Sequence, residues 1–270
     1  MAKRAKLTKG AGVQLLTDAD TASLAPISDV GGPGRWLLVR YLPASLFSLK
    51  ASSASSGVGR TLLVPTPYSV KMALLDAGLT SGLIHGDDEA EKLVLGLRNA
   101  PVRVGVPEQA VVTHTIIKIR QEPKPPRPEG VAYGSNVAYR EFVHFSGEMI
   151  LAWDLHSLDR ETVESICSIA PVVRYMGKRG SFFQFCGFSR SETLGHNFTA
   201  TLEKLELVPN RAHIAWLDDF GPEVSFDVLN SFSKTPIKRE KHRRFVQTIV
   251  PLGRVNVGPG FTHYQVHSEE

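Results

Sequence analysis

The turn Gly177-Lys178-Arg179-Gly180 places two cations between two glycines. It follows a helix-like segment and leads into an aromatic-rich strand, residues 182–188. Because glycine has no Cβ, the main chain and its N–H groups can approach a phosphate backbone closely. Two interpretations stay open from this segment alone: a turn that contacts phosphates, or a solvated connection in front of a buried strand.

Three further basic segments could contact nucleic acid. The first consists of Arg60 and Lys71, which flank the first predicted helix, Lys71 lying off its apolar stripe. The second is a proline-rich insertion with cations and tyrosines: Lys118, Arg120, Lys124, Arg127, Tyr133, Tyr139 and Arg140. The third is the run 238–244, in which we select Lys238 and Arg239. Single-stranded RNA binding needs cations for phosphates and flat side chains for unpaired bases, although solvated loops are the alternative for both later segments.

The bulk composition limits the class of protein. The 270 residues are 42% hydrophobic and 21% charged, which is typical of a soluble globular chain. A net charge of only +4 means that any nucleic-acid surface must be local. Apolar runs are too short to span a bilayer, and the start has no secretory h-region. We expect a cytoplasmic protein with no membrane contact.

Cysteine usage and motifs predict no metal and no cofactor. The two cysteines, Cys167 and Cys186, fall on an apolar helix face and in the aromatic strand. They are therefore expected to be buried thiols in a reducing compartment. The sequence contains no CxxC pair, HExxH or P-loop.

Hydrophobic periodicity predicts an α+β fold. A strand over 35–49 precedes a helix with Thr66 as N-cap, Pro67 as first residue and Gly78 as stop. A second helix follows Asp87, with Ala90, Leu93, Val94 and Leu97 on its buried stripe. Strands over 111–120 and 143–155, a helix capped by Asp159, and the strand at 182–188 complete the unit. Without the extra helix the order is β-α-β-β-α-β, the ferredoxin-like arrangement of RNA-recognition modules.

Three regions follow from this pattern. Residues 1–34 form an N-terminal extension, and 35–200 form the ferredoxin-like domain. Four prolines in the insertion between its strands forbid a continuous ladder, so we expect a protruding hairpin or loop over 118–142. Residues 201–270 form a β-rich C-terminal part, with strands expected over 211–216, 224–228, 245–251 and 261–266.

The helix PTPYSVKMALLDAG, the long insertion and the segment YMGKRGSFF together resemble the Cas-five family. These are the RAMP subunits of type I CRISPR effector complexes, and the resemblance covers roughly residues 35–190. Gly180 and Ser181 stand where many members carry an acidic residue, which leaves the subtype open.

The resemblance implies a role in a ribonucleoprotein complex. Such subunits hold the 5′ handle of the crRNA at one end of the Cascade backbone. Their hairpin "thumb", here 118–142, reaches toward the adjacent backbone subunit. Another face docks the large subunit near the PAM duplex of the target DNA. The implied function is RNA-guided DNA targeting, in antiviral defence or guided transposition, with the turn 177–180 among the RNA contacts.

Two other functions remain as alternatives. Metal-independent endoribonucleases of related families need a base for a 2′-OH and an acid for the leaving 5′-oxygen. His114 shares a strand face with Lys118, and Tyr133 and Tyr139 follow, so such a site could be built. No acid–base cluster is forced by the spacing, however, so we expect no catalytic residue and no enzyme. A stand-alone single-stranded RNA-binding protein is the third class.

We expect Phe182, Phe183 and Phe185 in the core.

Overall fold

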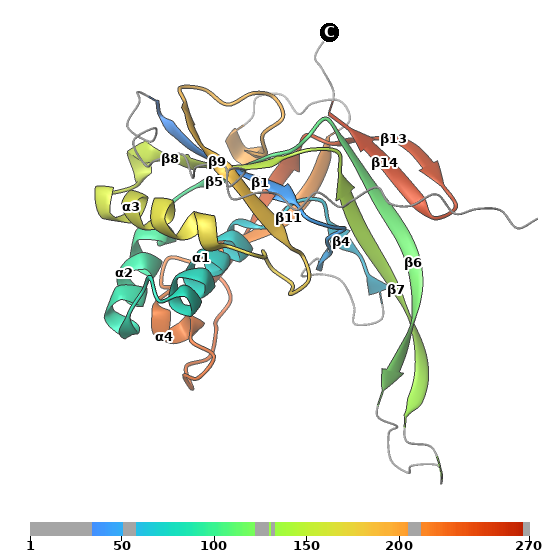
Figure 1. Cartoon of the computed structure of the whole chain (residues 1–270), viewed down its shortest axis with the longest axis horizontal. Coiled ribbons are helices and arrows are strands. Elements are labelled where there is room, and N and C mark those ends of the chain that lie inside the picture. The colour runs from blue at the N-terminus through green and yellow to red at the C-terminus, as the bar shows by residue number, and fades with distance from the viewer. Residues whose placement is uncertain (1–33, 51–57, 122–129, 131–132, 205–211, 267–270) are drawn as a thin grey trace, which may run out of the picture.

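The structure is a computed structural model that describes residues 34–50, 58–121, 130, 133–204 and 212–266. The predicted N-terminal extension, apart from Gly34, lies outside these residues, as do Lys124 and Arg127. The mostly antiparallel strands form four-, three-, five- and two-stranded sheets, and α-helices lie between them in the sequence. The α+β class is therefore confirmed. Figure 1 shows the helices gathered on one side and a long hairpin extending from the other.

The four-stranded sheet has the predicted order of elements but not all the predicted strands. The prediction of 111–120 as its second strand is wrong, because this segment pairs within the hairpin sheet and the short strand 102–105 takes its place. The four-stranded sheet contains β1 (Trp36–Pro43), β5 (Val102–Gly105), β8 (Met149–Asp154) and β9 (Phe183–Ser191) in the order β5-β8-β1-β9. All three pairings are antiparallel. Helices α1 (Pro67–Ser81) and α2 (Gly86–Arg98) connect β1 to β5, and α3 (Arg160–Ile169) connects β8 to β9. The strand order and directions are those of a β-α-β-β-α-β unit with one extra helix.

The main core lies between this sheet and the helices. Val39 and Tyr41 of β1 are each 1% exposed and face Val70 of α1 and Ile166 of α3. The Tyr41 hydroxyl donates a hydrogen bond of 2.8 Å to the carbonyl of Ala170, so its polar group is satisfied in the core.

Helix α1 begins as predicted and ends later. Thr66 is the N-cap, and its hydroxyl accepts from the Ser69 N–H at 3.1 Å. Gly78 does not stop the helix, which continues to Ser81. A Cβ at Gly78 would lie 2.5 Å from Ile84 Cδ1, so this glycine allows close packing instead. Gly82, with a left-handed φ of 71°, is the actual C-terminal cap.

The other two helices match their sequence signals. α2 begins with Asp87, Asp88 and Glu89 in its first turn, where acidic side chains suit the helix dipole. Its predicted stripe is buried: Ala90, Leu93, Val94 and Leu97. Asp159 caps α3 by accepting from the Thr162 N–H at 2.7 Å.

The insertion is a hairpin made of β6 (Gln109–Gln121) and β7 (Gly134–Phe145). Their pairing runs from Ala110 opposite Phe145 to Gln121 opposite Gly134. The pair extends well beyond the body of the molecule (Figure 1). β3 (Val58–Gly59) pairs in parallel with β7, and β14 (Phe261–Gln265) and β13 (Gly253–Gly258) extend the sheet beyond β6. The last two strands of the chain therefore share a sheet with the hairpin base.

Two strands predicted as continuous are interrupted. The alternation over 143–155 is divided between β7 and β8, separated by a turn at 146–148. Phe145, Met149 and Trp153 are all buried, so the period of two passes through the turn and conceals it. Likewise, β1 ends at Pro43, which lacks an N–H for a continuing ladder. Leu49 belongs to β2 (Leu49–Lys50), paired with β4 (Thr61–Leu62).

The C-terminal part contains a three-stranded sheet in the order β10-β12-β11. Its strands are β10 (Ala200–Thr201), β12 (Arg243–Val250) and β11 (His213–Phe220). The strand predicted over 224–228 is wrong, because this segment forms α4 (Phe226–Leu229). Val224, Phe226 and Val228 are buried in this segment, and such short apolar runs do not distinguish strand from helix.

Candidate nucleic-acid interface

The basic turn has the backbone geometry that its glycines allow. After α3, a 3-10 turn (Ala170–Val172) leads to Tyr175, which bridges to Phe182 across the turn. The Ser181 N–H donates to the Lys178 carbonyl at 3.0 Å and closes the turn. Gly177 and Gly180 have φ values of 72° and 97°, a region that L side chains rarely adopt.

The turn is anchored to the body while its cations project. Ser181 is 2% exposed, and its hydroxyl donates to the Ser48 carbonyl at 3.2 Å. A Cβ on Gly177 would lie 2.9 Å from Leu49 Cδ2, so the backbone packs tightly there. Lys178 and Arg179 are exposed. The turn therefore presents two charges from a fixed backbone, and ligand binding needs little ordering of the main chain.

A cleft of about 460 Å³ opens beside this turn. Its walls come from β2, β4, the first turns of α1, the basic turn, β11 and β12. Lys50 and Lys178 contribute cations, and Tyr68 and Tyr175 contribute aromatic rings. The N-terminal turn of α1 also lines the cleft, and the positive end of its dipole adds to the attraction for anions.

Acidic side chains in the cleft are already engaged. Asp76 accepts from the Tyr175 hydroxyl at 2.9 Å, and Asp218 accepts from Arg243 Nε at 2.6 Å. Burial raises the pKa of Tyr68, and the Arg243 guanidinium lies over its ring, 4.6 Å from the centroid. Among the described residues, Lys50 and Lys178 have no acidic partner, and the cleft keeps a positive local charge.

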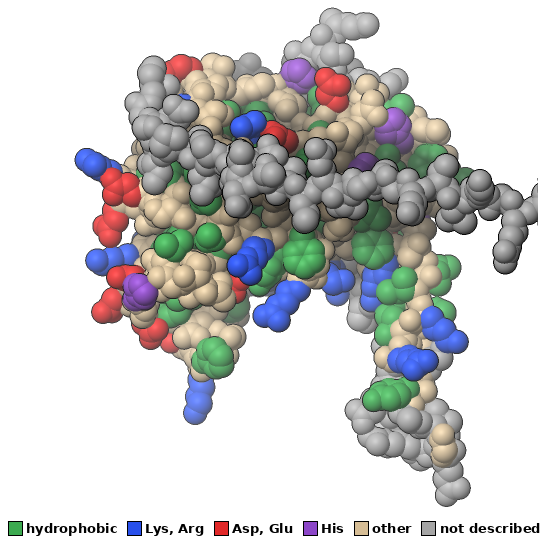
Figure 2. All heavy atoms as spheres, viewed as in Figure 1, with side chains coloured by type: hydrophobic (Ala, Val, Ile, Leu, Met, Phe, Trp, Pro, Cys, Tyr) green, Lys and Arg blue, Asp and Glu red, His purple; other side chains and the backbone are tan. Residues whose placement is uncertain are grey.

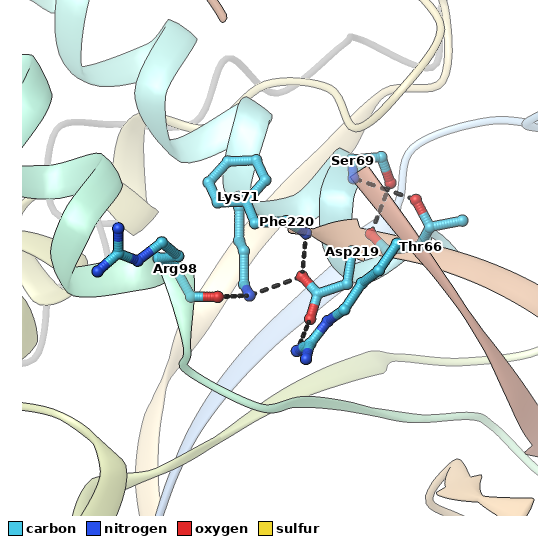
Figure 3. A network of polar contacts seen from close by, with 7 residues as sticks. Thr66, Ser69, Lys71, Arg98, Asp219 and Phe220 are labelled. Carbon is cyan, nitrogen blue, oxygen red and sulfur yellow. Dashed lines mark hydrogen bonds and ion pairs between the residues drawn. The ribbon is translucent and has the colours of Figure 1, made fainter. Parts of the chain in front are cut away.

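Lys71 was predicted as an RNA contact, and the structure contradicts this. Its side chain is 0% exposed, and Nζ donates to Asp219 Oδ1 at 2.6 Å and to the Arg98 carbonyl at 3.4 Å (Figure 3). Asp219 also accepts from the Phe220 N–H and from Arg244. Lys71 lies off the helical stripe but faces β11, which covers that side of α1. It ties α1 to β11 and is not accessible to a ligand.

The predicted hairpin contacts occupy the exposed shaft. Lys118 and Arg120 are exposed on the same face as Ile116, which is 75% exposed. Tyr133 is 64% exposed near the distal end. Figure 2 shows Lys and Arg side chains interspersed with apolar ones along the hairpin. This composition suits both phosphates and an apolar partner surface.

A polar cluster closes the hairpin base. The Tyr139 hydroxyl lies 2.5 Å from His114 Nδ1 and 3.1 Å from Glu141 Oε1, while His114 Nε2 lies 2.9 Å from Thr262 Oγ1. Glu141 also accepts from the Thr61 N–H. Burial is the main cause that raises the pKa of Tyr139, and the hydrogen bond and charge of Glu141 raise it further. Both nitrogens of His114 are therefore engaged, and Lys118 is not a member of the cluster.

The remaining predicted contacts lie in separate places. Arg60 is exposed beside the hairpin base, and Arg140 is half-buried, donating to the Tyr139 carbonyl at 2.8 Å. Lys238 and Arg239 are exposed in the turn before β12. The predicted core position holds for Phe183, which is 4% exposed, and Phe185 packs partly buried against the core. Phe182 is 50% exposed, so its prediction as core is wrong.

Of the two cysteines, Cys167 is buried as predicted, whereas Cys186 is only half-buried. β9 begins in the core and continues with half-buried residues, so Cys186 lies in its partly exposed portion.

Sequence reasoning missed part of the cleft. Lys50, Tyr68 and Tyr175 line it next to Lys178, and Arg243 closes it from β12. Only Arg243 had a signal, because it belongs to the basic run 238–244. Lys50 precedes a serine-rich loop, and the two tyrosines give no pattern, so only the folded chain brings them to the turn.

Comparison with known proteins gives one curated relative. No protein-family model matches the chain. The chain is 22% identical over 204 residues to the CRISPR-associated protein Cas5 of Archaeoglobus fulgidus, covering 74% of this chain and 86% of that protein. The sequence is thus homologous to a Cas5 protein, in agreement with the resemblance seen in its motifs.

Comparison with solved structures gives alignments to CRISPR proteins with TM-scores below 0.5. A crystal structure of a CRISPR protein from Archaeoglobus fulgidus aligns with a TM-score of 0.42 at 10% identity, covering 86% of this chain and 92% of that one. A chain of a CRISPR RNA-guided surveillance complex aligns with a TM-score of 0.41 at 14% identity, covering 79% and 88%. None of the helices in the described ranges is long and apolar enough to cross a membrane.

Proposed function

We propose that this chain is a CRISPR-associated, crRNA-binding subunit of an RNA-guided complex. The turn 177–180 and the adjoining cleft would hold the single-stranded 5′ handle of the crRNA. Similarity to a Cas5 protein supports this assignment, and the surface chemistry agrees with it. The same role would place the subunit at the end of a Cascade-type backbone in RNA-guided DNA targeting.

The anchored basic turn is the observation that carries the proposal. Two exposed cations project from a backbone that is fixed by Ser181 and by the packing of Gly177 on Leu49. The open cleft beside them contains Lys50 and two tyrosines. Cations for phosphates next to rings for bases are the combination that single-stranded RNA requires.

The hairpin supplies the partner contacts in this proposal. Exposed Ile116 and Val137 provide apolar area, and Lys118 and Arg120 provide charge on the same extended arm. An arm of this composition would contact the adjacent backbone subunit and the RNA lying between the two proteins. The large subunit, and through it target DNA near the PAM, would dock on another face, as the Cas-five resemblance implies.

The test is a charge-removal variant at the turn. Lys178→Ala with Arg179→Ala is expected to weaken binding of a short labelled single-stranded RNA, with little dependence on base sequence. The slope of log affinity against log salt should fall by roughly 0.7 for each phosphate that the variant no longer neutralises. Thermal stability should stay nearly unchanged, because exposed cations contribute little to folding.

The matched control removes the same charge elsewhere. Lys92→Ala with Arg160→Ala takes two exposed cations from α2 and α3, which do not line the cleft. This control should keep both the affinity and the salt slope of the unmodified chain. Equal effects of the two double variants, or an unchanged slope in the turn variant, would reject the turn as the RNA site. Copurified small RNAs should also share a uniform 5′ end.

A second candidate is metal-independent cleavage of precursor crRNA. One observation favours it: the direct contact of His114 with Tyr139, beside Glu141. Against it, the imidazole is held on both sides, and proton transfer to RNA would require that one of these contacts break. The two functions differ in outcome, because only the nuclease would cut a repeat RNA by itself in EDTA.

A further inference from the structure

The outer face of the ribbon formed by β11 and β12 carries an unassigned aromatic surface. Alternate residues of β11 point to opposite faces. Ala215 and Leu217 are buried on the inner face, whereas Ile214 and Trp216 on the outer face are 49% and 57% exposed. Trp36 and Trp153, the other two tryptophans of the chain, are buried at 9% and 1%.

Rings and guanidinium groups alternate from this face into the cleft. The Arg243 guanidinium lies 4.6 Å from the centroid of the Tyr68 ring and 5.8 Å from that of Phe245. Arg239 lies 5.3 Å from the same Phe245 ring. Asp218 pairs with Phe245 across the ribbon, so Trp216 is the diagonal neighbour of Phe245, at about 7–8 Å between Cα atoms.

Contacts within the protein position these rings and guanidinium groups in the absence of a ligand. Asp218, with a side chain only 6% exposed, accepts from Arg243 Nε at 2.6 Å and fixes the guanidinium. Upstream, the His242 N–H donates to the Lys238 carbonyl at 3.0 Å, and His242 Nδ1 accepts from the Lys238 N–H. Glu240 adopts a left-handed φ of 63° in this turn. This turn fixes the backbone from which the exposed Arg239 side chain reaches over the Phe245 ring.

We infer that this face, made of Trp216, Phe245, Arg239 and Arg243, binds unpaired bases of a single-stranded nucleic acid by stacking. Base planes stack on aromatic rings and on guanidinium planes, and such stacking tolerates any sequence. Lys238 and Arg239 have no acidic partner in the described part of the chain, so charge is left for the phosphates of the same strand.

The surface continues the cleft that the proposed function uses. Tyr68, Asp218 and Arg243 line that cleft together with Lys178. A strand held at the basic turn would therefore extend over Arg243 and Phe245 toward Trp216. The inference rests on the proposed function in that the ligand is the same single-stranded RNA, and it adds the chemistry by which its bases are held.

Tryptophan fluorescence gives a direct readout on the full chain. Trp216 is the exposed tryptophan, so a stacked base should quench its emission, while Trp36 and Trp153 are shielded. Short single-stranded RNA and DNA of the same sequence are titrated in parallel, with an abasic oligomer as the backbone-only control. We expect RNA to quench, and the abasic oligomer to leave the emission unchanged. Quenching by DNA alone would assign the face to a DNA strand and overturn the RNA assignment.

Three variants separate stacking from apolar packing and from charge. Trp216→Phe keeps a ring and should bind RNA within a few-fold of the unmodified chain, with the quenching abolished. Trp216→Leu keeps apolar bulk without a ring and should bind roughly ten-fold more weakly, the scale of removing one base stack. Trp216 is exposed, so neither change should affect folding. The turn variant Lys178→Ala with Arg179→Ala serves as the independent test of the proposed function.

The outcomes are distinguishable. RNA binding without quenching, or normal affinity of Trp216→Leu beside weak binding of the turn variant, overturns the stacking surface and leaves the proposed function standing. Weak binding of Trp216→Leu beside normal binding of the turn variant supports the stacking surface and rejects the turn. Absence of RNA binding by the unmodified chain rejects both. Burial of Trp216 by a copurifying protein subunit in an RNA-free complex would assign the face to a protein contact instead.

Discussion

The buried ion pair between Lys71 and Asp219 predicts that a second substitution restores stability lost by the first, which a double-mutant cycle can measure. Asp219→Ala leaves Lys71 fully buried, with the Arg98 carbonyl at 3.4 Å and the Phe220 ring, centroid at 5.4 Å, as its remaining partners. Removing one member of a buried pair in this way costs about 3–5 kcal/mol of unfolding free energy. Lys71→Met should cost less, about 1–3 kcal/mol, because Asp219 keeps the Phe220 N–H at 2.7 Å and Arg244 at 3.0 Å.

Adding Lys71→Met to Asp219→Ala should therefore restore stability relative to Asp219→Ala alone. The double variant buries no unpaired charge at this site, and Arg244, with a side chain 45% exposed, can be hydrated. Unfolding in urea, followed by circular dichroism, measures all four members of the cycle. A double variant less stable than Asp219→Ala would refute the interpretation of Lys71 as a charge that depends on Asp219.

The pH dependence provides a second readout of the same cycle. Burial lowers the pKa of Lys71 below 10.5, against the opposing effect of Asp219, so loss of Asp219 lowers it further. Between the folded and unfolded pKa values the unfolded chain binds more protons, and stability rises with pH. Asp219→Ala should thus gain stability as pH approaches 10.5, and the double variant should lack this gain. A flat profile for Asp219→Ala would contradict the assignment.

Two further changes test the turn and the hairpin base. Gly177→Ala should lower the thermal midpoint more than Gly180→Ala, because both have positive φ but only at Gly177 does the new Cβ meet a side chain, Leu49 Cδ2 at 2.9 Å; equal midpoints would mean that this packing is unimportant. His114→Ala should leave precursor RNA processing by the purified complex unchanged, as followed on gels in EDTA. Cleavage by the unmodified chain that disappears in His114→Ala would establish the nuclease function instead.

Local signals in the sequence were sufficient for most elements. Thr66 and Asp159 cap their helices through contacts three residues away, and the alternation of β6 is visible within its own strand. The turn 177–180 is equally local, since glycine is required by its own backbone angles. Where two elements shared one pattern, as at the break between β7 and β8, the sequence could not place the boundary.

The surroundings of individual side chains depended on distant parts of the chain. Lys71 resembles an exposed helix residue in sequence, yet Asp219, 148 positions later, covers and neutralises it. Tyr68 and Arg243 likewise come together with Lys178 only when β11 and β12 pack beside α1. Backbone propensity and capping act over a few residues, so most helices and strands could be located from the amino-acid order alone. Burial and charge pairing depend on which elements meet in space, so the cations that face a ligand could be identified only in the folded chain.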